Sequence, residues 1–363
     1  MRITAHVCAS FGRDTMGSAV RTMLRHTHRQ VRHVGVVAPA AAKGQVRQVY
    51  AQAEHDFGFL APPVVLHSSS PAPLAASWLM LRETLLADGR VDRPLKELVA
   101  AEVSRANSCP YCIEVHQAAR ETLSPPPTPT AALAAWARDT GRTSRGPGDD
   151  AAPLAPWQAP ELFGVAVTFH YLNRMVSIFL ADSPVPRRTP RRLKEPIMRT
   201  VARAMRPSAS RVPAGASLSL LPEGSLPPGL DWARDNPAVG EALGRAATAV
   251  NDAAGWVPEQ IRARVSARLQ SWDGGPVGPS RAWLSDALTG LPESETAVAR
   301  LALLTAFAAY QVTDSDITAF RAHHSADRAL IELTSWAAMT AAACVGSRLT
   351  VPRQVESPNT GTA

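Results

Sequence analysis

Hydrophobic residues recur every three or four positions over long stretches of this chain, which is the spacing of one buried face of an α-helix. Leu74, Trp78, Leu81 and Leu85 form one such series, and Pro160–Asp182 is apolar almost all round. The helix-forming residues Ala, Leu, Arg and Glu are plentiful, whereas Ile, Tyr and Phe, which favour strands, are sparse. The pattern therefore predicts an all-α protein.

Prolines, glycines and capping residues suggest where these helices begin and end. We expect Gly89 to close one helix as its C-terminal cap, Asp92 to cap the next and Pro94 to occupy its first turn. Residues 121–160 contain proline- and glycine-rich runs, which predict a long connection around one short helix. The predicted helices are Pro39–Phe57, one from Leu74 to Gly89, one from Asp92 broken at Asn107-Ser108, one starting at Pro110, Ala131–Asp139, Pro160–Asp182, Pro237–Ala254, Pro258–Trp272, Ser280–Leu288, Ser294–Gln311, Thr313–His323 and Asp327–Thr350.

The chain has 363 residues, more than one compact core usually holds, so two domains are expected. Its halves resemble degenerate copies, because residues 71–107 align with 237–273 without a gap. The apolar stretches 160–182 and 296–320 are expected to correspond as well. We therefore predict two tandem helical copies.

The second copy lacks the polar and sulfur-bearing side chains of the first, and the aligned pairs are Glu97 with Ala263, Cys109 with Gly275, and Cys112 with Gly278. We expect this copy to be structural, completing a helical core that a one-copy relative would form by self-association. The predicted organisation is an N-terminal extension (1–36), a domain carrying the cysteine pair (37–186), a basic and proline-rich linker (187–229), a degenerate helical domain (230–350) and a disordered tail (351–363).

The formal net charge is +7, and a single segment carries more than this excess. Between Arg187 and Arg211, nine Lys or Arg residues accompany one acid, Glu195. The segment lacks the interleaved aromatic residues of single-strand nucleic-acid binders. We interpret it as a solvated face or a mobile connector, with an anionic partner as the alternative, and expect no nucleic-acid partner.

The sequence contains no run of about 18 unbroken apolar residues, so we expect no membrane-spanning helix. Its N-terminal residues lack the apolar core of a secretory signal, and a cytoplasmic location with no membrane contact is predicted. Four cysteines in so long a chain do not make a disulfide framework. In a reducing compartment the close pair Cys109 and Cys112 instead indicates redox chemistry or metal binding.

The candidate chemistry lies between residues 92 and 120. Cys109 and Cys112 are one helical turn apart at a predicted helix N-terminus, where free N–H groups are expected to lower a thiol pKa from ~8.5 towards neutrality. His116 follows four residues after Cys112, on the same face, and can take the thiol proton. A carboxylate on the preceding helix would fix the imidazole tautomer or relay the proton onward.

This segment resembles the AhpD-like alkylhydroperoxidase branch of the carboxymuconolactone decarboxylase superfamily. The motif is a glutamate twelve residues before Cys-x-x-Cys, then three residues and a histidine. Glu97, Cys109, Cys112 and His116 match it at every position, and a looser resemblance extends across roughly residues 37–182. The resemblance implies an all-α, oligomeric antioxidant protein that reduces hydroperoxides through its cysteine pair.

The resemblance also implies a role for each residue of the motif. Cys112 attacks the peroxide and becomes a sulfenic acid, Cys109 captures it as a disulfide, and Glu97 with His116 relays protons. A dithiol donor then resets the pair by exchange, for which a lipoyl carrier or a thioredoxin-like protein is chemically suited. Glu102 lies on the apolar stripe of the same helix and remains the second candidate for the relay carboxylate.

Other interpretations remain open at this stage. The CPYC sequence also occurs in glutaredoxins, but there it follows a strand, and here helical spacing precedes it. A structural zinc site would need a fourth ligand, for which His170 is available. A lyase of the same superfamily would use acid–base residues alone, and a silent scaffold or binding protein would keep the CxxC for packing. We expect no cofactor and no bound metal, and we interpret His170 and Arg174 as core residues.

Overall fold

The computed structural model describes residues 30–123, 130–142, 152–185, 188–205 and 211–351. Within these segments the protein is built from helices and their connections, with no strand. The all-α prediction is therefore confirmed. The predicted N-terminal extension lies largely outside the described residues, as does all but the first residue of the predicted tail.

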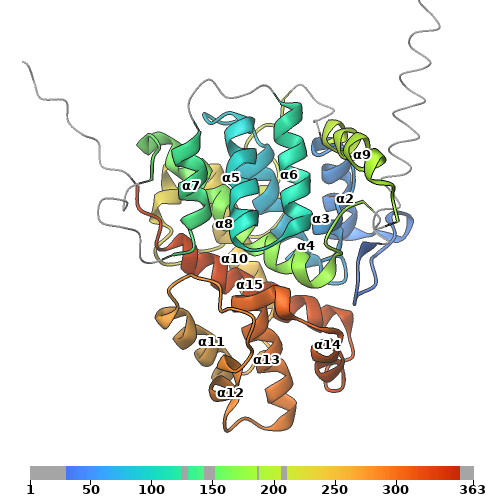
Figure 1. Ribbon diagram of the computed structural model, residues 1–363, viewed down its shortest axis with the longest axis vertical. Helices are drawn as coiled ribbons and strands as arrows, with labels where there is room; N and C mark the ends of the chain where they lie inside the picture. Colours follow the sequence, from blue (N-terminus) through green and yellow to red (C-terminus); the bar gives the residue numbers. More distant parts are fainter. Residues whose placement is uncertain (1–29, 124–129, 143–151, 186–187, 206–210, 352–363) are drawn as a thin grey trace, which may run out of the picture.

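The helices fall into two groups along the chain (Figure 1). The first group comprises α2 (Gly44–Asp56), α3 (Pro62–Val65), α4 (Pro71–Leu81), α5 (Arg93–Ala106), α6 (Pro110–Thr122), α7 (Ala131–Asp139), α8 (Ala159–Phe179) and α9 (Arg191–Ala204). The second comprises α10 (Pro237–Ala253), α11 (Glu259–Ser271), α12 (Trp283–Leu288), α13 (Glu293–Ala308), α14 (Asp314–Arg321) and α15 (Asp327–Gly346). Short turns η2 (Pro39–Ala41), η3 (Arg82–Leu86), η4 (Pro156–Gln158), η5 (Leu218–Leu220), η6 (Asp231–Asp235) and η7 (Ala309–Gln311) link or extend them.

Most predicted helix bounds agree with the structure to within a few residues, and α7 matches its prediction at both ends. The predicted cap at Gly89 is wrong, because the helix that begins as α4 ends as the π-helical turn η3, with Ala87 at its C-terminus. Gly89 is instead needed for close packing against Glu161. A Cβ atom there would lie 2.2 Å from Oε2 of Glu161, so only glycine leaves room for that buried carboxylate. Asp92 occupies the N-cap position of α5 without a capping hydrogen bond from its side chain.

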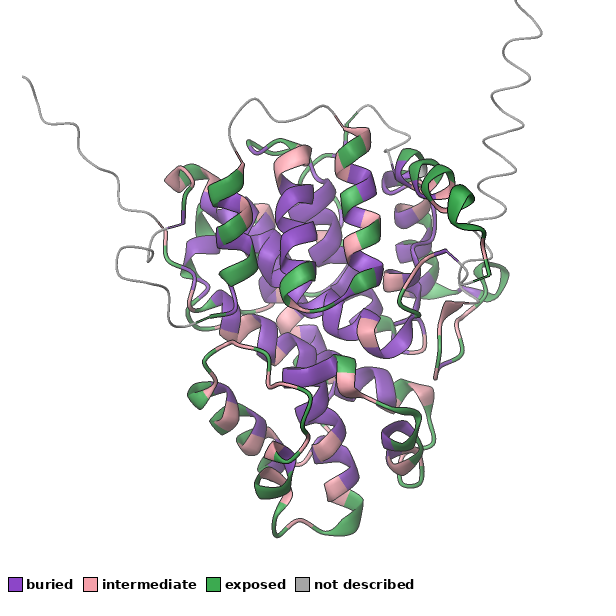
Figure 2. Cartoon of the chain, viewed as in Figure 1, coloured by how far each residue is buried: buried purple, intermediate pink, exposed green. Residues whose placement is uncertain are grey.

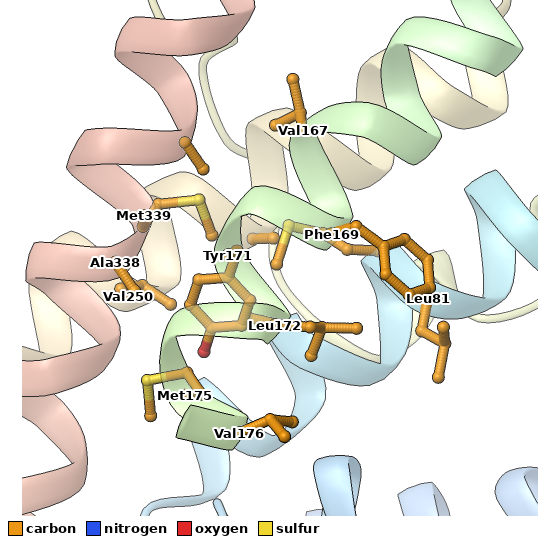
Figure 3. Packing of buried hydrophobic residues seen from close by; sticks show 14 of the residues in the cluster. Leu81, Val167, Phe169, Tyr171, Leu172, Met175, Val176, Val250, Ala338 and Met339 are labelled. Carbon is orange, nitrogen blue, oxygen red and sulfur yellow. The ribbon is translucent and has the colours of Figure 1, made fainter. Parts of the chain in front are cut away.

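Helix α8 is the central element of the fold, and it is buried almost along its entire length (Figure 2). It packs against α5 on one side and α15 on the other. Figure 3 shows the two directions: Tyr171 faces Ala338 and Met339 of α15, whereas Phe169 extends towards Leu81. The candidate site lies on the α5 side of this core.

Two helices are long and apolar enough to cross a membrane by length and composition: the segment 156–179, which includes α8, and α15. Of their apolar windows, 94% and 78% of the residues are buried inside the protein. This burial is typical of core helices, whose all-round hydrophobicity is satisfied by neighbouring helices.

The two halves share a helical frame and pack closely together. Helix α10 begins 166 residues after α4 (237 − 71), and α11 begins 166 residues after α5 (259 − 93). Across the junction, α4 packs against α10 and α8 against α15. The expected match of 160–182 with 296–320 is wrong, because the latter stretch is interrupted between α13 and α14. The long, buried helix that matches α8 is α15, which begins 168 residues later (327 − 159).

The basic segment forms helix α9 over residues 191–204, so the interpretation as a mobile connector is wrong for that part. Its arginines are exposed to solvent. Met198 and Ala202 on the opposite face pack with Ala118 of α6 and with Val185. The segment is therefore an amphipathic helix whose charged face is solvated, in agreement with the interpretation as a solvated face.

Candidate functional site

The turn between α5 and α6 sets the position of the cysteine pair. The Cys109 N–H donates to the Ser104 carbonyl, and the Ser108 N–H donates to the Arg105 carbonyl. These two bonds form a Schellman motif, which requires a left-handed residue. Ser108 takes this conformation with a φ of 52°, although glycine is the residue that adopts it without strain. The motif ends α5 and presents Cys109 as the N-cap of α6, with Pro110 in the first turn.

The two thiols of the pair lie side by side in the interior. The Sγ atoms of Cys109 and Cys112 are 2.8 Å apart, and both side chains are buried. Burial raises the pKa of the Cys112 thiol well above its ordinary value, and the adjacent Cys109 acts in the same direction. The predicted fall of the thiol pKa is therefore wrong for Cys112, because loss of solvent outweighs the favourable helix end. Its deprotonation needs a base.

His116 is held by the glutamate that the motif predicts. Its Nδ1 lies 2.6 Å from Oε2 of Glu97, which is fully buried. Arg93 Nε donates to the other carboxylate oxygen at 2.7 Å. Burial alone would raise the pKa of Glu97, but Arg93 and His116 outweigh it and hold that pKa below its ordinary value. An ionised Glu97 accepts a hydrogen bond from the His116 Nδ1–H and thereby leaves the Nε2 lone pair available as a base.

Glu102, the second candidate for this position, lies elsewhere. Its carboxylate accepts a short hydrogen bond from Arg138 of α7 and lies 3.3 Å from Arg105. Helix α5 is covered by α6 on one face and by α7 on another, so the two glutamates face different neighbours. The structure brings Glu97, and not Glu102, to His116.

An apolar pocket lies against the cysteine pair, with about 680 Å³ of empty space including its open mouth. Cys112 and His116 both line it, and no direct hydrogen bond joins these two described residues. The imidazole and Phe169 rings pack nearly perpendicular to each other, with ring centroids 4.5 Å apart. Most of the remaining wall is apolar and comes from Phe57, Phe59, Leu81, Val115, Leu172 and Val201 of α9. A reacting molecule in this pocket would touch the thiol and the base at once.

Two site residues escaped the sequence analysis. Arg93 is recognisable in retrospect by its spacing of four residues from Glu97 on one helix face. Asn173 carries no such local signal, since it comes from α8. Its side chain donates to Ser104 Oγ at 3.0 Å, and a hydrogen bond with Cys112 lowers the pKa of that thiol against the effect of burial. It is the polar neighbour that favours the Cys112 thiolate.

His170 is not directed at the cysteines. Its Nδ1 accepts from Asn107 at 3.1 Å, and its Nε2 lies 2.9 Å from Thr140 Oγ1. Burial, followed by the charge of Arg174, holds the pKa of His170 well below its ordinary value. With both ring nitrogens bonded, His170 does not supply the fourth ligand that a zinc site at the CxxC would need. No cluster of three or more potential ligands occurs in the described parts of the chain.

Comparison with known proteins assigns the chain to a class. The model of the carboxymuconolactone decarboxylase family matches residues 72–145, which include the whole motif. The alkyl hydroperoxide reductase Rv2159c of Mycobacterium tuberculosis is 35% identical over 333 residues, covering 87% of this chain and 94% of that protein. The chain therefore belongs to the carboxymuconolactone decarboxylase family, in its AhpD-like branch, as the motif implied.

The comparisons also bear on the two-part arrangement of the fold. The match to the mycobacterial protein is long enough to run through both helical halves, so the two-part arrangement is not peculiar to this chain. Uncharacterized protein 4 in the cox locus of Paracoccus denitrificans is 37% identical over 49 residues, which is 14% of this chain and 44% of that protein.

Proposed function

We propose that the protein is a thiol peroxidase that reduces organic hydroperoxides through Cys109 and Cys112. The observation that carries this proposal is the shared pocket: a thiol with a partner thiol 2.8 Å behind it, and an imidazole oriented by a buried carboxylate, face one apolar space. The family and the alkyl hydroperoxide reductase name of the mycobacterial relative support it.

The reaction begins with Cys112. His116 Nε2 takes the thiol proton, and the thiolate sulfur attacks the terminal peroxide oxygen, which breaks the O–O bond. The same proton passes to the departing alkoxide, so the products are an alcohol and a sulfenic acid on Cys112. Because the thiol and the imidazole are not directly bonded, the peroxide or a water between them carries the proton.

Cys109 completes the oxidative half. Its thiol attacks the sulfenic sulfur, a disulfide forms and water leaves. A dithiol donor, such as a lipoyl carrier or a thioredoxin-like protein, then reduces the disulfide by exchange and is itself oxidised.

Gln30 is suited to orient the substrate within the pocket. Its Nε2 donates to the Pro184 carbonyl at 2.9 Å, which fixes the amide, and its Oε1 is buried without a hydrogen-bond partner among the described residues. Gln30 lines the same pocket, so this oxygen can accept a hydrogen bond from the hydroperoxide O–H. The apolar walls would hold the organic group.

A single-turnover assay tests the proposal. The reduced protein should consume one equivalent of cumene hydroperoxide, lose two free thiols and gain a Cys109–Cys112 disulfide detectable by mass spectrometry. Cys109→Ser should stop at a sulfenic acid on Cys112 that dimedone traps, whereas Cys112→Ser should be inert. Cys344→Ser, which changes a thiol outside the pocket, is the control and should react as the parent does. Parental consumption by Cys112→Ser would overturn the assignment.

A further inference from the structure

A second pocket lies where the two halves meet, on the other side of the α5–α6 turn. It holds about 440 Å³ of empty space, including its opening. The first half contributes Asn107, Ser108 and residues of α8, and the second contributes Trp272, Phe307 and the glycine-rich residues 274–275. Among its lining residues Arg174 is the single charged side chain, and none is acidic.

Arg174 is a buried cation that has no carboxylate partner among the residues that the structure describes. Arg174 is only 6% exposed to solvent. Nε donates to the Ala306 carbonyl at 2.9 Å, and Nη1 donates to the His170 carbonyl at 2.6 Å. No acidic side chain of the described residues forms an ion pair with it, and its Nη2 has no hydrogen bond to them. Asp273, beside the pocket, accepts a hydrogen bond from the Gly275 N–H.

Two other buried cations of this protein, unlike Arg174, pair with a carboxylate. Lys96 pairs with Glu161 at 2.7 Å, and Arg82 pairs with Asp56 at 2.6 Å. A charge that leaves water is stabilised in proteins by an opposite charge or by a ligand. Two carbonyl oxygens accept hydrogen bonds from the Arg174 guanidinium, and its Cζ lies 6.0 Å from the centroid of the Trp272 ring, but none of these groups supplies a full negative charge. Burial lowers the pKa of Arg174 to about 10.

We infer that this pocket binds a small organic anion, whose carboxylate or phosphate group pairs with Arg174. The planar fork of a guanidinium matches two oxygens of such a group. Trp272, Phe307 and Tyr310 supply aromatic walls for an organic body, and Ser177 and Ser108 supply hydroxyl groups. The site lies between the halves, so it exists only because the second half is present.

The local backbone is shaped to form this pocket. Gly274 has a φ of 83°, and a Cβ there would overlap the Gly141 carbonyl at 1.5 Å, so the loop can approach the end of α7 only with glycine. This loop occupies the position in the second half that the cysteine pair occupies in the first. The second half therefore contributes a binding wall rather than a second reactive centre.

The inference does not depend on the peroxidase proposal, because binding is measurable without turnover. Calorimetry of the full-length protein with sodium benzoate and, separately, inorganic phosphate at constant ionic strength should show saturable binding of at least one of them, with sodium chloride as the reference. Binding of benzoate indicates that the site takes a carboxylate, and binding of inorganic phosphate indicates that it takes a phosphate group. Arg174→Lys, which keeps the charge and loses the fork, should weaken binding by about tenfold to a hundredfold.

Arg234→Gln is the control, because it removes an exposed, ion-paired arginine that does not line the pocket and should leave binding unchanged. Crystals of the unaltered protein soaked in selenate provide a second measurement that requires no variant. An anomalous peak beside the Arg174 guanidinium is expected. Absence of saturable binding by both anions, unchanged binding by Arg174→Lys, or a selenate peak elsewhere with none at Arg174 would each overturn the inference.

Discussion

Replacing Glu97 by Gln removes one charge from the centre of the proposed relay and leaves its shape. The carboxylate is fully buried, accepts from Arg93 and orients His116 at 2.6 Å. An amide can turn its NH₂ group towards Nδ1, and the imidazole proton then moves to Nε2, where it faces the pocket. The Nε2 atom of His116 would then carry a hydrogen, so it could donate a hydrogen bond but could no longer take the Cys112 thiol proton.

The expected loss follows from the role of the base. Positioned proton transfer contributes about 10²–10⁴-fold to rate, so the single-turnover rate of cumene hydroperoxide consumption should fall by a factor in that range. Because burial raises the pKa of Cys112, little spontaneous thiolate is available to mask the loss. Stopped-flow thiol oxidation at neutral pH measures the rate directly.

Glu102→Gln is the matched control, since it removes a glutamate from the same helix whose partners are Arg138 and Arg105. Its rate should stay within about threefold of the parent, as for a change outside the proton path. A Glu97→Gln rate equal to the parent, or a larger loss in Glu102→Gln, would refute the assigned relay.

Glu97 also predicts a pH dependence of stability. Its pKa is lowered in the folded protein, so its contribution is complete above the ordinary carboxyl range and is lost as pH falls through the lowered value. Urea unfolding between pH 6 and about 3 should show a steeper acid loss for the parent than for Glu97→Gln. Parallel profiles for the two proteins would contradict the lowered pKa.

Three further substitutions test other parts of the site. Asn173→Ala should shift the pH profile of thiol alkylation at Cys112 to higher pH, because the hydrogen bond that lowers that thiol pKa is lost; an unshifted profile would remove Asn173 from the site. Ser108→Gly should stabilise the fold by about 1 kcal/mol in urea unfolding, because glycine adopts a φ of 52° without strain. Gly89→Ala should destabilise it by about 3 kcal/mol, because the new Cβ displaces the buried Glu161 carboxylate from its pair; an unchanged unfolding midpoint would contradict this packing.

The sequence predicted the features that are encoded locally. Helix bounds, the short helix α7 and the spacing of the motif all depend on residues within a few turns of each other. The apolar stripe of α5 favoured Glu102 over Glu97, and it was misleading because α5 is buried on more than one face. A single stripe identifies the buried side only when the other side meets water.

Features that arise from packing were not predictable in this way. The rise in the Cys112 pKa depends on how completely other elements exclude water, and Asn173 reaches the thiol from a helix far along the chain. Arg174 looked like a core residue, and it is buried as expected. Whether an acidic side chain pairs with Arg174 depends on which elements pack around it, and none of the described residues supplies one.

The junction of α4 with α10 and of α8 with α15 has a consequence for behaviour on dilution. If these surfaces belonged to separate chains, the fraction associated would depend on protein concentration. Here one polypeptide carries both partners, so their effective concentration is set by the connecting chain and is constant. The pocket between the halves, and the wall that α8 provides to the cysteine pair, should therefore persist in a cell that holds only a few copies of the protein.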